Sequence, residues 1–167
     1  SRGIGHHHQR HNNVRDATFA FAVAFTPVSK EETVRRLRPG DLFFTQLFDL
    51  PTAVDTVVCS PFLLSQSPGY IYPPDTNPQR EVRSAELSKD NKHAENCHHA
   101  GLAFLAAGWD SFGSAGNGAT RLLDALHAEV KATRARPKAW PTIFQVVSQS
   151  IAASNAEWLT HYFASVT

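Results

Sequence analysis

The sequence predicts a mixed α/β domain in which a short mixed sheet is flanked by helices. Two observations carry this prediction. Segments with apolar residues at helical spacing alternate with short runs rich in Phe, Val and Thr, which favour strands. The chain has 167 residues, which suits one domain with its own core and is short for two, so we expect a single domain over 1–167.

The N-terminal half is predicted to begin with an irregular polar segment over 1–11. A helix follows from Asn12 or Asn13, which are good N-cap residues, to about Phe25. Two strands are expected over 41–48 and 53–60, with room for an earlier strand within 26–34, and a proline-rich loop covers 61–80. The helix expected to end near Phe25 should bury one face, which is formed by Val14, Ala17, Thr18, Phe21 and Phe25.

The C-terminal half is predicted to hold three helices and one strand. A helix over 81–99 ends at Gly101, and the apolar run at 102–107 is a short buried strand before a glycine-rich loop. Helices are expected over 119–134 and 141–165. The inward residues of the last helix are expected to be Ile143, Phe144, Val147, Ile151, Trp158 and Tyr162.

Composition restricts the classes of function. No apolar run approaches the ~20 residues that span a bilayer, and the pattern leads us to expect no secretory signal. The two cysteines, Cys59 and Cys97, are too few for a disulfide framework, so we expect reduced thiols and an intracellular protein. A net charge of +1 provides no overall attraction to nucleic acid, so any DNA binding must depend on local basic clusters.

Two aspartates form the candidate site. If the strands pair as a hairpin centred near Phe48, Asp41 lies opposite Asp55, and directly paired residues have Cβ atoms roughly 4.5–5.5 Å apart. Carboxylates at that distance repel each other, and a divalent cation relieves the repulsion, because Mg²⁺ favours one or two carboxylates with waters and phosphate oxygens. The alternative is that Asp41 is a turn residue and Asp55 a charge at a strand edge.

The helix over 81–99 supplies a second set of candidates. Glu86, Lys89 and His93 share one face with the apolar Val82, and Lys92 is adjacent to that face. A lysine that points partly inward could neutralise charge on an attacked phosphate. The alternative is an ordinary solvated, charged helix surface.

Several motifs, taken in order, resemble a known family. RHNNVRD, RPGDLFF, AVDTVVCSP and AELSKDNKH occur in this order within about residues 8–115. The set resembles the restriction-enzyme-like endonuclease domain at the C-terminal end of reverse transcriptases from site-specific non-LTR retrotransposons, within the PD-(D/E)xK nuclease superfamily. The resemblance implies a restriction-endonuclease-like core and a catalytic site for phosphodiester hydrolysis.

The resemblance also implies roles for individual residues. Asp41 and Asp55 match the two metal-binding aspartates, which would hold Mg²⁺ or Mn²⁺. Lys89 resembles the catalytic lysine, with Lys92 as the other candidate. Val57 departs from the lysine that most superfamily members carry on the strand. His93 likewise departs from the tyrosine that usually closes the helix motif.

Further acidic and basic residues complete the expected site. Glu31 or Glu32 resembles an acidic residue that follows the first helix in this family and would assist catalysis. Arg10 and His11 match the motif that opens that helix, and contact with DNA is expected of both. A second cluster expected to contact DNA phosphates comprises Arg35, Arg36 and Arg38.

These observations predict a metal-dependent DNA endonuclease. In the family, the nick primes reverse transcription, so the expected partners are DNA, the retroelement RNA and a reverse transcriptase segment of the same parent protein, in the nucleus. The alternative is a catalytically inactive, retroelement-derived structural subunit whose partners are the proteins of a larger assembly. The modest charge and His93 favour this alternative, whereas Asp41, Asp55 and Lys89 favour the enzyme.

Overall fold

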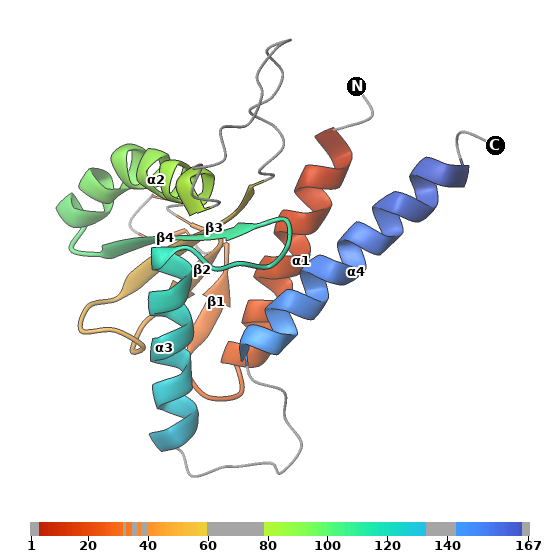
Figure 1. The fold of residues 1–167 in the computed structure, drawn as a ribbon. Coiled ribbons are helices and arrows are strands. Elements are labelled where there is room, and N and C mark those ends of the chain that lie inside the picture. The colour runs from red at the N-terminus through yellow and green to blue at the C-terminus, as the bar shows by residue number, and fades with distance from the viewer. Residues whose placement is uncertain are drawn as a thin grey trace.

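The computed structural model describes residues 4–31, 33–34, 37, 40–59, 79–132 and 143–164. The structure contains both helices and strands, as the sequence predicts for a mixed α/β domain (Figure 1). The elements are, in order, α1 (Ile4–Ala22), β1 (Val28–Lys30), β2 (Leu42–Phe44), β3 (Thr52–Cys59), α2 (Gln79–His99), β4 (Ala103–Asp110), α3 (Asn117–Ala132) and α4 (Ile143–Ala164).

The four strands form one mixed sheet in the order β1-β2-β3-β4. The first three strands are antiparallel neighbours, and β4 lies parallel to β3 after the connection through α2. In the β2–β3 pair, Leu42 lies opposite Val54 and Phe44 opposite Thr52. This register is the one expected for a hairpin centred near Phe48. The paired residues end at Leu42, and the amide of Asp41 donates to the carbonyl oxygen of Val54, so Asp41 does not continue the regular pairing opposite Asp55 as the sequence predicts.

Side chains from the sheet point alternately into two apolar layers, as strand geometry requires. The smaller layer lies beneath α2, where Phe43 and Ala53 pack with Cys97 and Leu102. α2 therefore covers one face of the sheet, while α1, α3 and α4 contribute to the larger layer on the other face (Figure 1). The sheet residues of that larger layer are Leu42, Phe44, Val54, Leu105, Ala107 and Trp109.

Helix α1 begins at Ile4, so the expectation of an irregular segment over 1–11 is wrong for residues 4–11. The reason is tertiary: α4 runs beside α1 (Figure 1) and binds its N-terminal half. Gln9 donates a 2.7 Å hydrogen bond to Glu157. One turn further on, Asn13 donates a 2.8 Å bond to Ser154. These partners lie far away in the sequence, so local helix signals do not reveal them.

Other boundaries also differ from the sequence-based expectation. β2 ends at Phe44, so it covers only part of the 41–48 run. β4 continues to Asp110, into the predicted glycine-rich loop, because Trp109 is buried at 1% exposure. Phe144 is 48% exposed instead of pointing inward. The residues at 61–78, and the side chains of Trp158 and Tyr162, lie outside the described part of the structure.

Three other expectations agree with the structure. β1 supplies the early strand within 26–34. Gly101 follows α2 with a φ of +69°, a left-handed conformation that glycine adopts without strain. Cys59 and Cys97 are free thiols. Within the described ranges, no helix combines the length and the apolar character needed to cross a membrane.

Candidate carboxylate–lysine site

Asp41 reaches the site through a close contact between two backbone segments. The amide of Asp41 donates a 2.9 Å hydrogen bond to the carbonyl oxygen of Val54 on β3. A Cβ atom on the preceding Gly40 would lie 2.6 Å from the same carbonyl oxygen. Only glycine therefore allows the backbone at position 40 to lie this close to β3. This close contact brings Asp41 near Asp55.

The Asp41 carboxylate is held by Thr56 and His11. Its Oδ2 atom accepts hydrogen bonds from the Thr56 amide at 2.8 Å and the Thr56 hydroxyl at 2.6 Å. Its Oδ1 atom lies 3.3 Å from Nε2 of His11. The other imidazole nitrogen of His11, Nδ1, lies 3.4 Å from the Thr56 hydroxyl. With a protonated imidazole the three side chains close a ring of hydrogen bonds, in which His11 donates twice.

Asp55 faces the opposite helix. Its position on β3 shares the α2 side of the sheet with Ala53, and its side chain is almost fully buried. Nζ of Lys89 on α2 donates a 2.7 Å hydrogen bond to Oδ2 of Asp55. Lys92 is exposed on the same helix, and within the described part of the chain it forms no ion pair or hydrogen bond. Of the two candidate lysines, Lys89 therefore belongs to the site.

The electrostatics of the two carboxylates differ. Burial favours the neutral form of Asp41, but the hydrogen bonds from His11 and Thr56 outweigh it and bring the pKa of Asp41 well below its usual range. Burial raises the pKa of Asp55, and the neighbouring charge of Asp41 adds to this rise, while Lys89 opposes it. The hydrogen bond to Asp41 raises the pKa of His11, against the effect of its burial. Because the charge of Asp41 acts on the pKa of Asp55, the two carboxylates lie near each other.

His93 borders this cluster on the next turn of α2 after Lys89. Its ring lies 5.4 Å from the ring of Phe104 on β4. Burial lowers the pKa of His93, and the charge of Asp55 opposes that effect. His93 is thus an aromatic side chain packed next to the site.

The other predicted site residues do not all join the cluster. The Glu31 carboxylate accepts a 2.6 Å hydrogen bond from Arg15, and the Glu31 amide donates a 2.8 Å bond to the carbonyl oxygen of Asp41. Arg10 donates a 3.4 Å hydrogen bond to Asn155 of α4. Glu32, Arg35, Arg36 and Arg38 lie outside the described residues.

The acidic side chains of the cluster offer few ligands for a metal ion. Among the residues that the structure describes, no group of three or more His, Cys, Asp or Glu side chains is arranged to hold a metal ion. Mg²⁺ often uses only one or two carboxylates and completes its shell with waters and substrate oxygens. Asp41 and Asp55 fit this open type of site, and they do not fit a closed one built from protein ligands alone.

Thr56 is absent from the sequence-based candidates, and Glu86, which shares the candidate face of the helix, has a different role in the structure. Thr56 binds Asp41, and the predicted hairpin register could have found it, because it places Thr56 opposite Gly40. Glu86 is almost fully buried and accepts amide hydrogen bonds from Gly108 at 2.9 Å and Gly118 at 3.0 Å. Glu86 thereby ties α2 to β4 and to the N-terminus of α3, and its role is structural.

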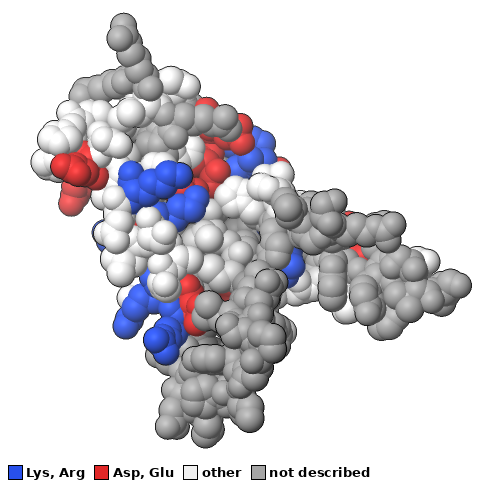
Figure 2. Space-filling model, turned by 90° about the horizontal axis from the view of Figure 1, so that it is seen from above, with Lys and Arg blue, Asp and Glu red and all other residues white. Residues whose placement is uncertain are grey.

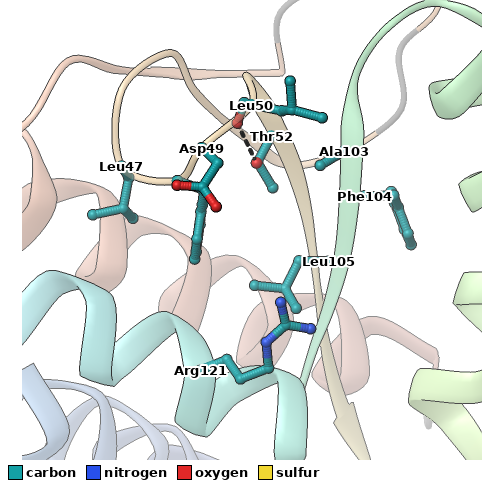
Figure 3. Close-up of a pocket in the computed structure, with 9 residues that line it drawn as sticks. Leu47, Asp49, Leu50, Thr52, Ala103, Phe104, Leu105 and Arg121 are labelled. Carbon is teal, nitrogen blue, oxygen red and sulfur yellow. Dashed lines mark hydrogen bonds between the residues drawn. The ribbon is translucent and has the colours of Figure 1, made fainter.

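A separate cavity of about 390 Å³ lies near the start of β3 and β4. Figure 3 shows Asp49 and Arg121 extending toward it from the β2–β3 connection and from α3. None of its lining residues belongs to the carboxylate cluster. On the face shown in Figure 2, the described Lys and Arg side chains lie in separate groups with acidic side chains next to them, so this face shows no continuous basic surface.

Comparison of the chain with models of protein families, with curated proteins and with solved structures gives no match. The function must therefore be argued from the geometry of the site.

Proposed function

We propose that this domain is a metal-dependent DNA endonuclease with a restriction-endonuclease-like core, which nicks a target for reverse transcription of a retroelement. The observation that carries the proposal is the 2.7 Å contact between Lys89 and Asp55, next to Asp41. The motif resemblance names these same three residues. Asp55 lies on β3, Asp41 directly before β2 and Lys89 on α2, so three separate segments contribute to the cluster.

The roles of the residues follow from their chemistry. Asp41 and Asp55 would bind Mg²⁺ or Mn²⁺, which when bound would act as a Lewis acid on the scissile phosphate and activate the attacking water. Lys89 would stabilise the negative charge that develops on the phosphate. Its side chain is 35% exposed, so its ammonium group can move from Asp55 toward a phosphate without crossing the core.

A nicking assay on supercoiled plasmid tests the proposal. The parent protein should convert the plasmid to the open-circular form with Mg²⁺ or Mn²⁺ and not with EDTA. Lys89→Met should lose most of this activity, whereas Lys92→Met should retain it. Equal activity of the parent and Asp55→Asn would indicate a contaminating nuclease and remove the support for the proposal.

A specific observation favours a second candidate, a catalytically inactive structural subunit derived from a retroelement. Both carboxylates have basic partners in the protein, Lys89 for Asp55 and, when its imidazole is protonated, His11 for Asp41. The fold therefore needs no divalent cation to balance the pair. This candidate predicts no nicking and no effect of Mg²⁺ on stability.

A further inference from the structure

The pairing of β2 does not orient the side chain of Asp41, so another contact has to do so. Asp41 precedes β2, which begins at Leu42, so its backbone lies at the end of the paired region. An aspartate at a strand end can rotate about two side-chain torsions and offer either oxygen to a ligand. For a binding site, one of its orientations must be selected.

Thr56 performs this selection with two donors from a single residue. Its amide and its hydroxyl both bond the same oxygen of Asp41, at 2.8 and 2.6 Å. The other oxygen of Asp41 lies 3.3 Å from Nε2 of His11, which is longer than the roughly 2.7–2.9 Å of a strong charge-assisted bond. One oxygen is thus firmly held, and the other is the one that can exchange its partner.

We propose that Thr56 is a positioning residue that holds Oδ2 of Asp41 so that Oδ1 is presented to a divalent cation shared with Asp55. This inference rests on the proposed function. Thr56 is fully buried on β3, next to Asp55 in the chain. One strand therefore supplies both a carboxylate of the site and the group that orients the other carboxylate.

The consequence is selectivity between cations. Mg²⁺ needs nearly ideal octahedral geometry at about 2.0–2.1 Å, whereas Ca²⁺ accepts variable geometry at about 2.3–2.6 Å. Loss of an orienting contact should therefore weaken Mg²⁺ binding more than Ca²⁺ binding. A purely structural role of Thr56 would lower both affinities by a similar factor or change only stability.

Calorimetric titration of the whole chain with Mg²⁺ and separately with Ca²⁺ tests the inference. Thr56→Val should weaken Mg²⁺ binding by about 10–100-fold, the usual effect of removing a group that orients a ligand. Its Ca²⁺ affinity should fall by a clearly smaller factor. Thr56→Ser keeps the hydroxyl and should bind both cations as the parent does.

Thr52→Val is the matched control. Thr52 is a buried threonine on the same strand, and its hydroxyl donates a 2.7 Å hydrogen bond to the Leu50 carbonyl instead of a carboxylate. This variant should bind both cations like the parent. Melting temperatures in EDTA identify folded variants, and if Thr56→Val is unfolded, Thr56→Ala is compared with Thr56→Ser instead.

The possible results separate the two proposals. Parental Mg²⁺ affinity in Thr56→Val, or an equal loss for Mg²⁺ and Ca²⁺, would overturn the role of Thr56 and leave the metal site intact. A parent protein that binds neither cation would overturn the proposed function, and the role of Thr56 with it. A selective loss of Mg²⁺ affinity that serine restores would support the inference.

Discussion

Nζ of Lys89 lies 2.7 Å from Oδ2 of Asp55, although the two residues are 34 positions apart in the sequence. The contact joins the middle of α2 to the middle of β3 and gives a nearly buried carboxylate a cationic partner. Both proposed functions depend on this pair, because the enzyme would use the lysine on a phosphate and the scaffold would use it only to balance charge.

Removing Lys89 should lower stability as well as any activity. Lys89→Met should reduce the free energy of unfolding by about 1–3 kcal/mol, since it removes a hydrogen bond to a charged group, and partial exposure of the lysine favours the lower end. Lys92→Met should change it by less than about 0.5 kcal/mol. Urea unfolding of both variants checks the contrast, and equal effects would contradict the assignment of Lys89.

Metal binding should stabilise the enzyme. Mg²⁺ at 100 times its Kd should add ~2.7 kcal/mol, which for a domain of this size is roughly a 5–10 °C rise in melting temperature. Asp55→Asn should abolish the rise because it removes a charged ligand. Asp49→Asn, at the separate cavity, is the control and should keep it. A parent protein whose melting temperature does not change with Mg²⁺ or Mn²⁺ would support the proposal of a catalytically inactive structural subunit.

Without metal, Asp55→Asn should preserve or increase stability at pH 7. A raised carboxyl pKa in the folded state means that folding disfavours the charged form, so this penalty is present above the folded pKa and disappears as the pH falls through it. Asparagine removes the charge and can still accept a hydrogen bond from Lys89. Urea unfolding in EDTA checks this, and a large loss of stability would show that the ion pair outweighs burial.

His11 should stabilise the fold in a pH-dependent way. Its pKa is raised by Asp41, so its contribution is fully present below its unfolded pKa of about 6.5 and is lost as the pH rises through its folded pKa. The difference in unfolding free energy between the parent and His11→Gln should therefore be larger at pH 6 than at pH 9. A pH-independent difference would indicate that packing, not charge, determines the effect.

Gly40 should tolerate no side chain. Gly40→Ala would set a Cβ atom 2.6 Å from the Val54 carbonyl oxygen, and the backbone cannot yield as a flexible side chain would. We expect a loss of about 1–3 kcal/mol in unfolding free energy, as for other overpacked positions. Gly116→Ala makes a useful comparison, because its nearest neighbours are side-chain atoms of Glu86 and Val82. Thermal melts of both variants measure the difference.

The amino-acid sequence by itself determined the central hairpin. Runs rich in Phe, Val and Thr on either side of Phe48 predict a register in which Leu42 lies opposite Val54, and β2 and β3 have that register. The spacing of Val82, Glu86, Lys89 and His93 likewise specified which face of α2 turns toward the sheet. These features are local, since each depends on residues within one hairpin or one helix.

The tertiary structure decided which side chains complete the site. Packing of α2 on the sheet selects Lys89 over Lys92, and packing of α1 brings His11 to Asp41 and Thr56 across 30 and 45 positions. It also extends α1 back to Ile4 through contacts with α4. Such contacts depend on how the helices dock on the two faces of the sheet, and helical periodicity defines the buried face of a helix but not the residue that the face meets.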